Sequence, residues 1–127
     1  MEQVKFYRCI HCGNTVVFLH ESGVPVVCCG EKMQLLTANS TDAAVEKHVP
    51  AVTVEGSKVH AVVGSVLHPS TAEHHIEWLY LQTEKGGSFV KLDTLAEPRA
   101  EFAVAEGDKP LAVYAYCNLH GLWVKEL

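Results

Sequence analysis

Short runs of β-branched and aromatic residues, broken by glycine and charged residues, fill the chain from Val49 onward. Three segments have this pattern, and each predicts two strands joined as a hairpin. Their turns are expected at residues 55–57, 85–87 and 106–108. Six or seven strands at this spacing predict an antiparallel β-sandwich. No stretch has the helical period over enough residues to predict a long helix.

The first 36 residues form a separate region, which holds four of the five cysteines. A segment this short cannot fold by packing alone, since domains below about 40 residues usually need a metal, disulfides or a partner chain. Residues 37–44, TANSTDAA, are small and polar, and we interpret them as a linker. Its serine, threonine or aspartate, at positions 40–42, is able to cap a single helical turn. The predicted domains are therefore residues 1–36 and 45–127.

The charge, the apolar segments and the cysteine content of the chain exclude several classes of protein. The net charge of -5 and the lack of a basic stripe exclude a nucleic-acid binder. The N-terminal sequence MEQVKFYRC lacks the apolar run of a signal peptide, and no segment approaches the roughly 20 apolar residues that span a bilayer. We therefore expect a cytoplasmic protein without membrane contact. In a reducing cytosol, five cysteines are better candidates for metal or redox chemistry than for disulfides.

The four N-terminal cysteines predict a metal site. Cys9 and Cys12 form a C-x-x-C turn that brings two sulfurs onto one ion, and Cys28 and Cys29 complete a tetrahedral set. The adjacent pair is unusual, because neighbouring side chains normally point apart. Sulfur ligation suits both zinc and iron, so a structural zinc site and an electron-carrying iron site both remain open.

A second set of donors lies where the predicted strands begin or end, so that one end of the sandwich can gather them. Imidazoles with one thiolate suit divalent iron, and five protein ligands leave the sixth octahedral position open to a reactant. His60 lies within a strand and is interpreted as an ordinary polar residue. His74 and His75 compete for one place. The candidate donors are His48, His68, His74 or His75, Cys117 and His120.

Several motifs, in order and with compatible gaps, resemble desulfoferrodoxin, the two-iron superoxide reductase family, across nearly the whole chain. They are YRCIHCGN, VCCGEKM, EKHVP, the pair His68 and His74, and YCNLHGLW. The resemblance implies a mainly β protein. A small desulforedoxin-like N-terminal domain would be followed by an immunoglobulin-like antiparallel β-sandwich.

The resemblance also implies two non-haem iron ions per chain and assigns their ligands. The first iron is implied to be bound by Cys9, Cys12, Cys28 and Cys29. The second is implied to be bound by His48, His68, His74, His120 and an axial Cys117, opposite an open position. His74 is preferred to His75 because the third histidine of the family follows the second by six positions.

Catalytic roles and partners follow from the same resemblance. Lys47 is implied to sit beside the open position, and Glu46 to close over the oxidised iron as a sixth ligand. The implied reaction reduces superoxide to hydrogen peroxide without producing oxygen, and rubredoxin or a similar carrier re-reduces the iron. A homodimer is expected, since the N-terminal region lacks a core of its own. The sequence departs from some relatives at Ala115, where they have an acidic residue.

Two other functions are compatible with the residues. The chain could be a non-enzymatic electron carrier, in which the four-cysteine iron is the active centre and the sandwich is a docking surface. It could also be a zinc-stabilised binding module with two structural sites. The metal content of the protein and its reaction with superoxide distinguish these functions.

Overall fold

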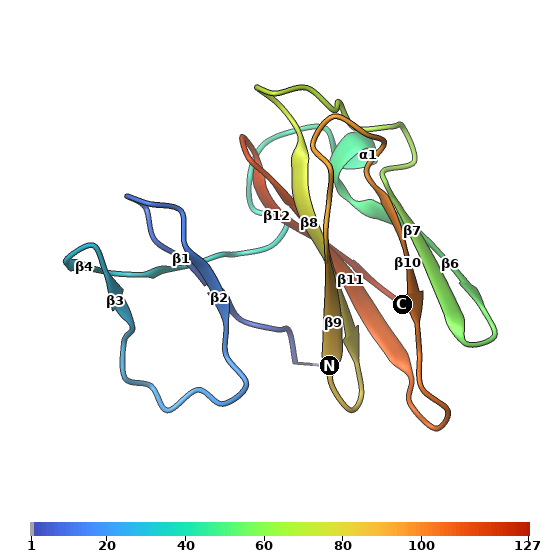
Figure 1. The fold of residues 1–127 in the computed structure, drawn as a ribbon, viewed down its shortest axis with the longest axis horizontal. Coiled ribbons are helices and arrows are strands. Elements are labelled where there is room, and N and C mark those ends of the chain that lie inside the picture. The colour runs from blue at the N-terminus through green and yellow to red at the C-terminus, as the bar shows by residue number, and fades with distance from the viewer. Residues whose placement is uncertain (1) are drawn as a thin grey trace. The chain divides into compact units, whose positions relative to one another are not determined.

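A computed structural model describes residues 2–127, and the chain divides into two compact units, Met1–Thr37 and Ala38–Leu127. The mainly β architecture predicted from the sequence is confirmed (Figure 1). No helix among the described residues has the length and apolar character needed to cross a membrane.

The N-terminal unit contains two small antiparallel sheets. One has the order β2 (Thr15–Val17), β1 (Phe6–Arg8), β5 (Gln34–Leu35), and the other pairs β3 (Val27–Cys28) with β4 (Glu31–Lys32). Its buried apolar residues are Phe6, Cys9 and Met33. So few buried side chains leave little apolar surface to offset the entropy lost on folding, and a metal ion would supply the missing stabilisation.

The C-terminal unit is a sandwich of two antiparallel sheets, as in immunoglobulin-like folds. One sheet has three strands in the order β10, β7, β6, and the other has four in the order β12, β11, β8, β9. A short helix, α1 (Val45–His48), precedes the first strand. The strands are β6 (Pro50–Glu55), β7 (Lys58–Val63), β8 (Ile76–Thr83), β9 (Gly87–Lys91), β10 (Arg99–Ala103), β11 (Pro110–Cys117) and β12 (Gly121–Glu126).

The core of the sandwich follows the two-residue period of its strands. In β7, Val59, Ala61 and Val63 are buried while the residues between them are more exposed. In β11 the residues that join the same hydrophobic cluster are Val113, Ala115 and, at the end of the strand, Cys117. The alternation that builds the core therefore also carries the Cys117 thiol to the end of the sandwich.

Two local predictions were wrong. The segment around residues 106–108 does not form a hairpin, because β10 pairs with β7 whereas β11 pairs with β8 and β12. Its turn carries the chain from one sheet to the other. The helical turn is α1 itself: its N-cap is Ala44, with no side-chain cap hydrogen bond, so none of the polar residues at 40–42 caps it.

Candidate metal centres

The four N-terminal cysteines form one group. Cys9 and Cys12 flank the turn after β1, Cys28 ends β3, and Cys29 begins the turn to β4. Their four sulfur atoms all lie within 4.8 Å of one another. The Sγ atoms of Cys12 and Cys28 are 3.6 Å apart. Four sulfurs at such separations are suited to a single tetrahedral ion.

The backbone of the β3–β4 turn explains how adjacent cysteines join one group. Cys28 pairs with Glu31, which leaves Cys29 and Gly30 as a two-residue hairpin loop. Both have positive φ, 51° at Cys29 and 75° at Gly30, as tight hairpin turns require. The left-handed conformation takes Cys29 out of the strand, where its side chain would point away from that of Cys28. Only glycine adopts this conformation freely. A cysteine at this position therefore brings its thiol into the group at a conformational cost of about 1–2 kcal/mol.

Hydrogen bonds and the proximity of the four sulfur atoms shift the pKa values of these thiols in different directions. The backbone N–H of Cys12 donates to Cys9 Sγ at 3.5 Å, and this bond is the largest of the effects that lower the pKa of Cys9 to about 6. The Asn14 side chain donates to Cys28 Sγ at 3.5 Å. The hydrogen bond with Cys12 is the largest of the sulfur contacts that raise the pKa of Cys29 to about 12. Without a cation the group cannot hold four thiolates, whereas a bound cation would release the remaining protons; the donor set therefore fits a metal.

A second donor group gathers at the end of the sandwich where α1 lies (Figure 1). Its members come from the C-terminus of α1, the loop between β7 and β8, and the segment joining β11 to β12. One donor atom from each of four residues lies within 4.8 Å of the others; these are His48, His74, Cys117 and His120. His68 Nε2 is 3.4 Å from Cys117 Sγ, so the structure brings five donors together.

Hydrogen bonds fix which nitrogen of each buried histidine faces the group. His48 Nδ1 donates to the Ala44 carbonyl and His68 Nδ1 to the Pro69 carbonyl, both at 2.7 Å. Because a carbonyl only accepts, each neutral ring presents an unprotonated Nε2 to the other donors. Metal-bound histidines are commonly oriented by such outer hydrogen bonds.

One inner nitrogen lacks the partner that a buried polar atom normally has. His74 Nε2 is buried and has no hydrogen-bond partner among the described residues. His120 Nδ1 lies 3.0 Å from His48 Nε2 and 3.9 Å from Cys117 Sγ. An orphaned nitrogen beside a cluster of lone pairs would be costly in an apolar site, and a metal ion satisfies all of them at once.

Burial sets the ionisation of the second group. It lowers the pKa of His48 and His74, and the charge of Lys47 lowers both further. Burial likewise raises the pKa of Cys117, which is offset in part by the backbone N–H groups of Leu119 and His120. The imidazoles of His48 and His74 are therefore neutral and ready to bind at neutral pH, and a cation would draw the proton from the thiol.

We expect the metal-free C-terminal unit to lose stability as the pH falls from about 6.5 to about 4. Burial lowers the pKa of folded His68 to about 4, whereas a histidine in an unfolded chain titrates near 6.5. The unfolded chain therefore takes up protons first, and acid favours unfolding in this window. The neutral His68 contributes about 3 kcal/mol of stability, which is fully present above the window and is lost below it. Urea unfolding of the metal-free protein across this range measures it, and a constant stability would contradict it.

The turn that carries Glu46 and Lys47 is anchored by its backbone. The Glu46 carbonyl accepts the N–H of Val66 at 2.9 Å and the Ser65 hydroxyl at 3.3 Å. A Cβ atom on Gly64 would lie 2.6 Å from the same carbonyl oxygen. The loop after β7 thus holds α1 closely, while the side chains of Glu46 and Lys47 remain exposed.

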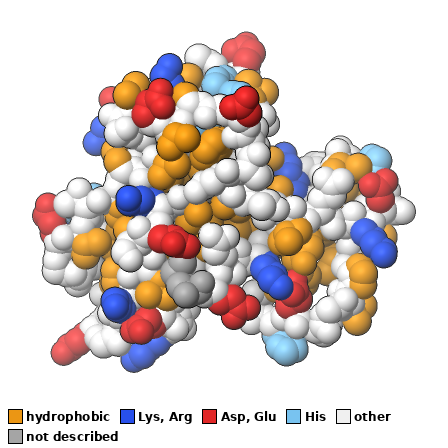
Figure 2. Space-filling view, turned by 180° about the vertical axis from the view of Figure 1, so that it is seen from behind, with side chains coloured by type: hydrophobic (Ala, Val, Ile, Leu, Met, Phe, Trp, Pro, Cys, Tyr) orange, Lys and Arg blue, Asp and Glu red, His pale blue; other side chains and the backbone are white. Residues whose placement is uncertain are grey.

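The group is closed on its core side and open on another. His48, His68 and Cys117 are buried, whereas His74 and His120 are half-buried. The space-filling view shows a histidine surface at the end of the sandwich that carries α1 (Figure 2). Glu46 and Lys47 directly precede His48 and are exposed, and their charges act on its imidazole.

Trp123 supports two donors, a role that was not predicted from the sequence. Its ring lies 4.9 Å from that of His48, and its Nε1–H donates to the His120 carbonyl at 3.1 Å. It lies within YCNLHGLW, but no spacing argument distinguishes an aromatic residue behind a metal site from a core residue. Three-dimensional contacts were needed to find it.

The other histidines lie outside both groups. The His75 ring donates from Nδ1 to the Thr71 carbonyl at 2.8 Å. His11 is exposed, with Nε2 3.3 Å from a Glu31 carboxylate oxygen. His20 is also exposed.

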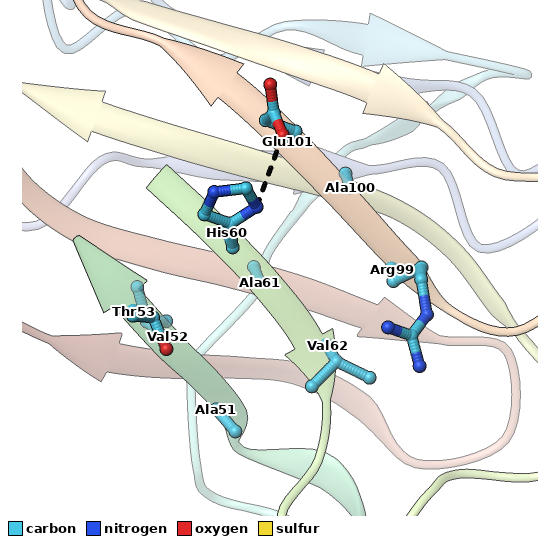
Figure 3. A pocket seen from close by; sticks show the side chains of 9 residues that line it. All are labelled: Ala51, Val52, Thr53, His60, Ala61, Val62, Arg99, Ala100 and Glu101. Carbon is cyan, nitrogen blue, oxygen red and sulfur yellow. Dashed lines mark ion pairs between the residues drawn. The ribbon is translucent and has the colours of Figure 1, made fainter. Parts of the chain in front are cut away.

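His60 lies in a shallow concavity of about 610 Å³ on the outer face of the three-stranded sheet (Figure 3). Its Nδ1 is 3.3 Å from a carboxylate oxygen of Glu101 on β10. None of the donors of either metal group lines this concavity.

Known proteins match both units. The family model described as desulfoferrodoxin matches residues 40–126, and that of the desulfoferrodoxin N-terminal domain matches residues 1–36. The desulfoferrodoxin of Nitratidesulfovibrio vulgaris is 45% identical over 125 residues, which span 98% of this chain and 97% of that protein. The superoxide reductase of Pyrococcus horikoshii is 41% identical over 109 residues, spanning 72% of this chain and 94% of that protein.

A solved structure matches along nearly the whole length. The crystal structure of the superoxide reductase from Treponema pallidum has a TM-score of 0.84 and 35% sequence identity with this chain. The match covers 98% of this chain and 100% of the other.

Proposed function

Because the chain belongs to the desulfoferrodoxin family, we propose that it is a superoxide reductase, which reduces superoxide to hydrogen peroxide without forming oxygen. The names of the P. horikoshii and T. pallidum proteins support this activity. The four-cysteine group and the histidine–cysteine group match the two iron sites of the family.

One observation carries the proposal: a single buried thiol and four imidazoles converge beside the turn that carries the exposed Glu46 and Lys47. An iron ion held by His48, His68, His74, His120 and Cys117 would supply the transferred electron, since imidazole suits divalent iron and a thiolate donates electron density to it. The N-terminal iron would be held by Cys9, Cys12, Cys28 and Cys29. A purely structural site would be fully enclosed by four ligands.

Lys47 is proposed to attract and orient superoxide. The protein has a net charge of -5, so an anionic substrate needs a local positive charge. The charge of Lys47 contributes to lowering the pKa of both His48 and His74, after the larger effect of burial, which places that charge near both rings. The reaction adds one electron and two protons to superoxide, and the Lys47 ammonium holds a proton at the site.

Glu46 is proposed to occupy the open position once the product has left. Its backbone is fixed by Val66 and Ser65, whereas its carboxylate is exposed. The carboxylate can therefore enter or leave the site by side-chain rotation while α1 stays in place. It would then exclude other ligands from the oxidised centre.

Replacing Lys47 by alanine is expected to slow superoxide capture by about tenfold, because electrostatic steering is worth about 10- to 1,000-fold. The rate constant should also become less sensitive to ionic strength. Pulse radiolysis of the reduced protein measures both. Lys109→Ala is the matched control. It removes the same charge at the residue before β11, and Cys117 lies at the opposite end of that strand. An equal loss in both variants would contradict a local role.

The overall reaction is tested by mixing the reduced protein with superoxide without air. We expect one hydrogen peroxide per oxidised second iron and no oxygen. Oxygen release, or no reaction at the metal-loaded second site, would refute the function. Catalytic turnover with a rubredoxin-type protein tests the proposed electron donor, and failure of that protein to re-reduce the site would exclude it.

A homodimer is proposed from the N-terminal unit. In this unit Leu19, Val24 and Val27 are 101%, 74% and 61% exposed, and few residues are buried. A second copy could cover this apolar surface. Sedimentation should give twice the 13.9 kDa mass of the chain, and a monomer would contradict the proposal.

A cytoplasmic location is proposed because all five cysteines are free of disulfides, as in reducing compartments. Fractionation of cells that produce the protein checks this, and recovery outside the cytoplasm would contradict it.

A further inference from the structure

The side chain of Asn118 ties together two loops that carry donors of the second group. Its Oδ1 accepts the backbone N–H of His75 at 2.9 Å, and its Nδ2 donates to the Glu73 carbonyl at 2.9 Å. Its backbone N–H also donates to the His75 carbonyl at 3.2 Å. One residue of the Cys117–His120 turn therefore makes three hydrogen bonds to the loop before β8.

These bonds bracket His74, since they hold the residues on both sides of it. The His74 backbone is otherwise closed into a local turn with Thr71, through bonds of 2.9 to 3.2 Å that stay within the loop. The rings of His48 and His68 differ, because each is fixed by a nearby carbonyl. The Asn118 bonds instead connect the loop of His74 to the residue that follows Cys117.

We propose that Asn118 is a positioning residue that sets the place of His74 Nε2 relative to Cys117 Sγ. It touches neither iron nor superoxide, and the inference rests on the proposed iron site. A neutral amide suits this task, because it both accepts from an N–H and donates to a carbonyl. A carboxylate here would still accept the His75 N–H. Its other oxygen would face the Glu73 carbonyl oxygen, and two acceptors repel each other.

Asn39 offers a matched comparison within the same unit. Its Oδ1 accepts the Val124 N–H at 2.9 Å and its Nδ2 donates to the Val124 carbonyl at 3.3 Å. It makes the same pair of bonds as Asn118, but with β12 and not with a donor-bearing loop. Asn118→Asp and Asn39→Asp therefore remove the same donor, and only the first lies between two loops with metal ligands.

The test uses the full-length protein with both irons bound. Release of each iron to a ferrous-iron chelator and the visible absorption of the oxidised second site are measured in both variants. Outer hydrogen-bond partners typically contribute 10- to 100-fold to metal affinity, so Asn118→Asp should release the second iron about tenfold faster and shift its thiolate absorption band. The N-terminal iron should be released at the wild-type rate, and Asn39→Asp should match wild type throughout.

An unchanged spectrum and release rate in Asn118→Asp, or equal changes in both variants, would overturn the positioning role. Asn118→Ala, which removes both side-chain bonds without adding charge, answers the same question if the aspartate variant does not fold. Wild-type protein that binds no iron at the second site would overturn the proposed function itself, which is a different outcome from wild-type behaviour of an Asn118 variant.

Discussion

Replacing Gly64 by alanine is expected to destabilise the second site. The new Cβ would lie 2.6 Å from the Glu46 carbonyl oxygen and 2.8 Å from that of Val49, and both are backbone atoms that cannot rotate away. Forcing such contacts costs about 1–3 kcal/mol, and the turn that carries Lys47 and His48 would have to move. Urea unfolding and second-site iron content measure the two effects.

Gly86→Ala is the control for this prediction. No heavy atom lies within 4 Å of the position where its Cβ would be, so the methyl group should be tolerated. A Gly64 variant with wild-type stability and full iron content would show that the loop after β7 does not hold α1 in place.

Replacing Cys117 by serine is expected to abolish superoxide reduction. The hydroxyl of serine stays protonated and cannot replace a thiolate, and Cys117 is the only sulfur in the second group. Losing an outer partner alone costs about 10- to 100-fold in metal affinity, so loss of a direct donor should cost more than about 100-fold. The visible thiolate band of the second iron should disappear, and the superoxide rate constant should fall at least as far.

Cys12→Ser is the reciprocal variant. It removes a donor from the four-cysteine group, which belongs to the other compact unit. We expect it to lose the N-terminal iron and to keep a superoxide rate constant close to that of wild type. Loss of the reaction in both variants would contradict independent centres and would indicate that the N-terminal iron relays electrons.

Much of the architecture could be predicted because it depends on local sequence patterns. Short β-branched runs at regular spacing predicted the sandwich, and glycines marked hairpin turns such as those before β7 and β9. The two donor groups were visible as cysteines and histidines at strand ends. The third turn could not be assigned correctly, because a turn sequence does not reveal whether its flanking strands pair with each other or with different sheets.

The parts that could not be predicted depend on single backbone angles and long-range contacts. The positive φ of Cys29 explains the adjacent cysteine pair, and no side-chain pattern indicates it. Spacing alone left His74 and His75 as rivals, and their different directions depend on the Thr71 turn and on Asn118. In the sequence Gly64 resembles any other loop glycine. Its importance depends on the nearby Glu46 carbonyl, whose position is known only from the structure.

The hydrogen bonds of His48 and His68 to nearby carbonyls have a consequence for biogenesis. A newly synthesised chain can fold its sandwich first, with the imidazoles already oriented as a preformed binding site. Binding of the catalytic ion then requires little rearrangement. We expect the opposite order for the N-terminal segment, because its few buried apolar residues leave its folding dependent on a bound ion. In an iron-starved cell, the sandwich would therefore persist as a loadable apoprotein, whereas the N-terminal segment would be the first target of proteases.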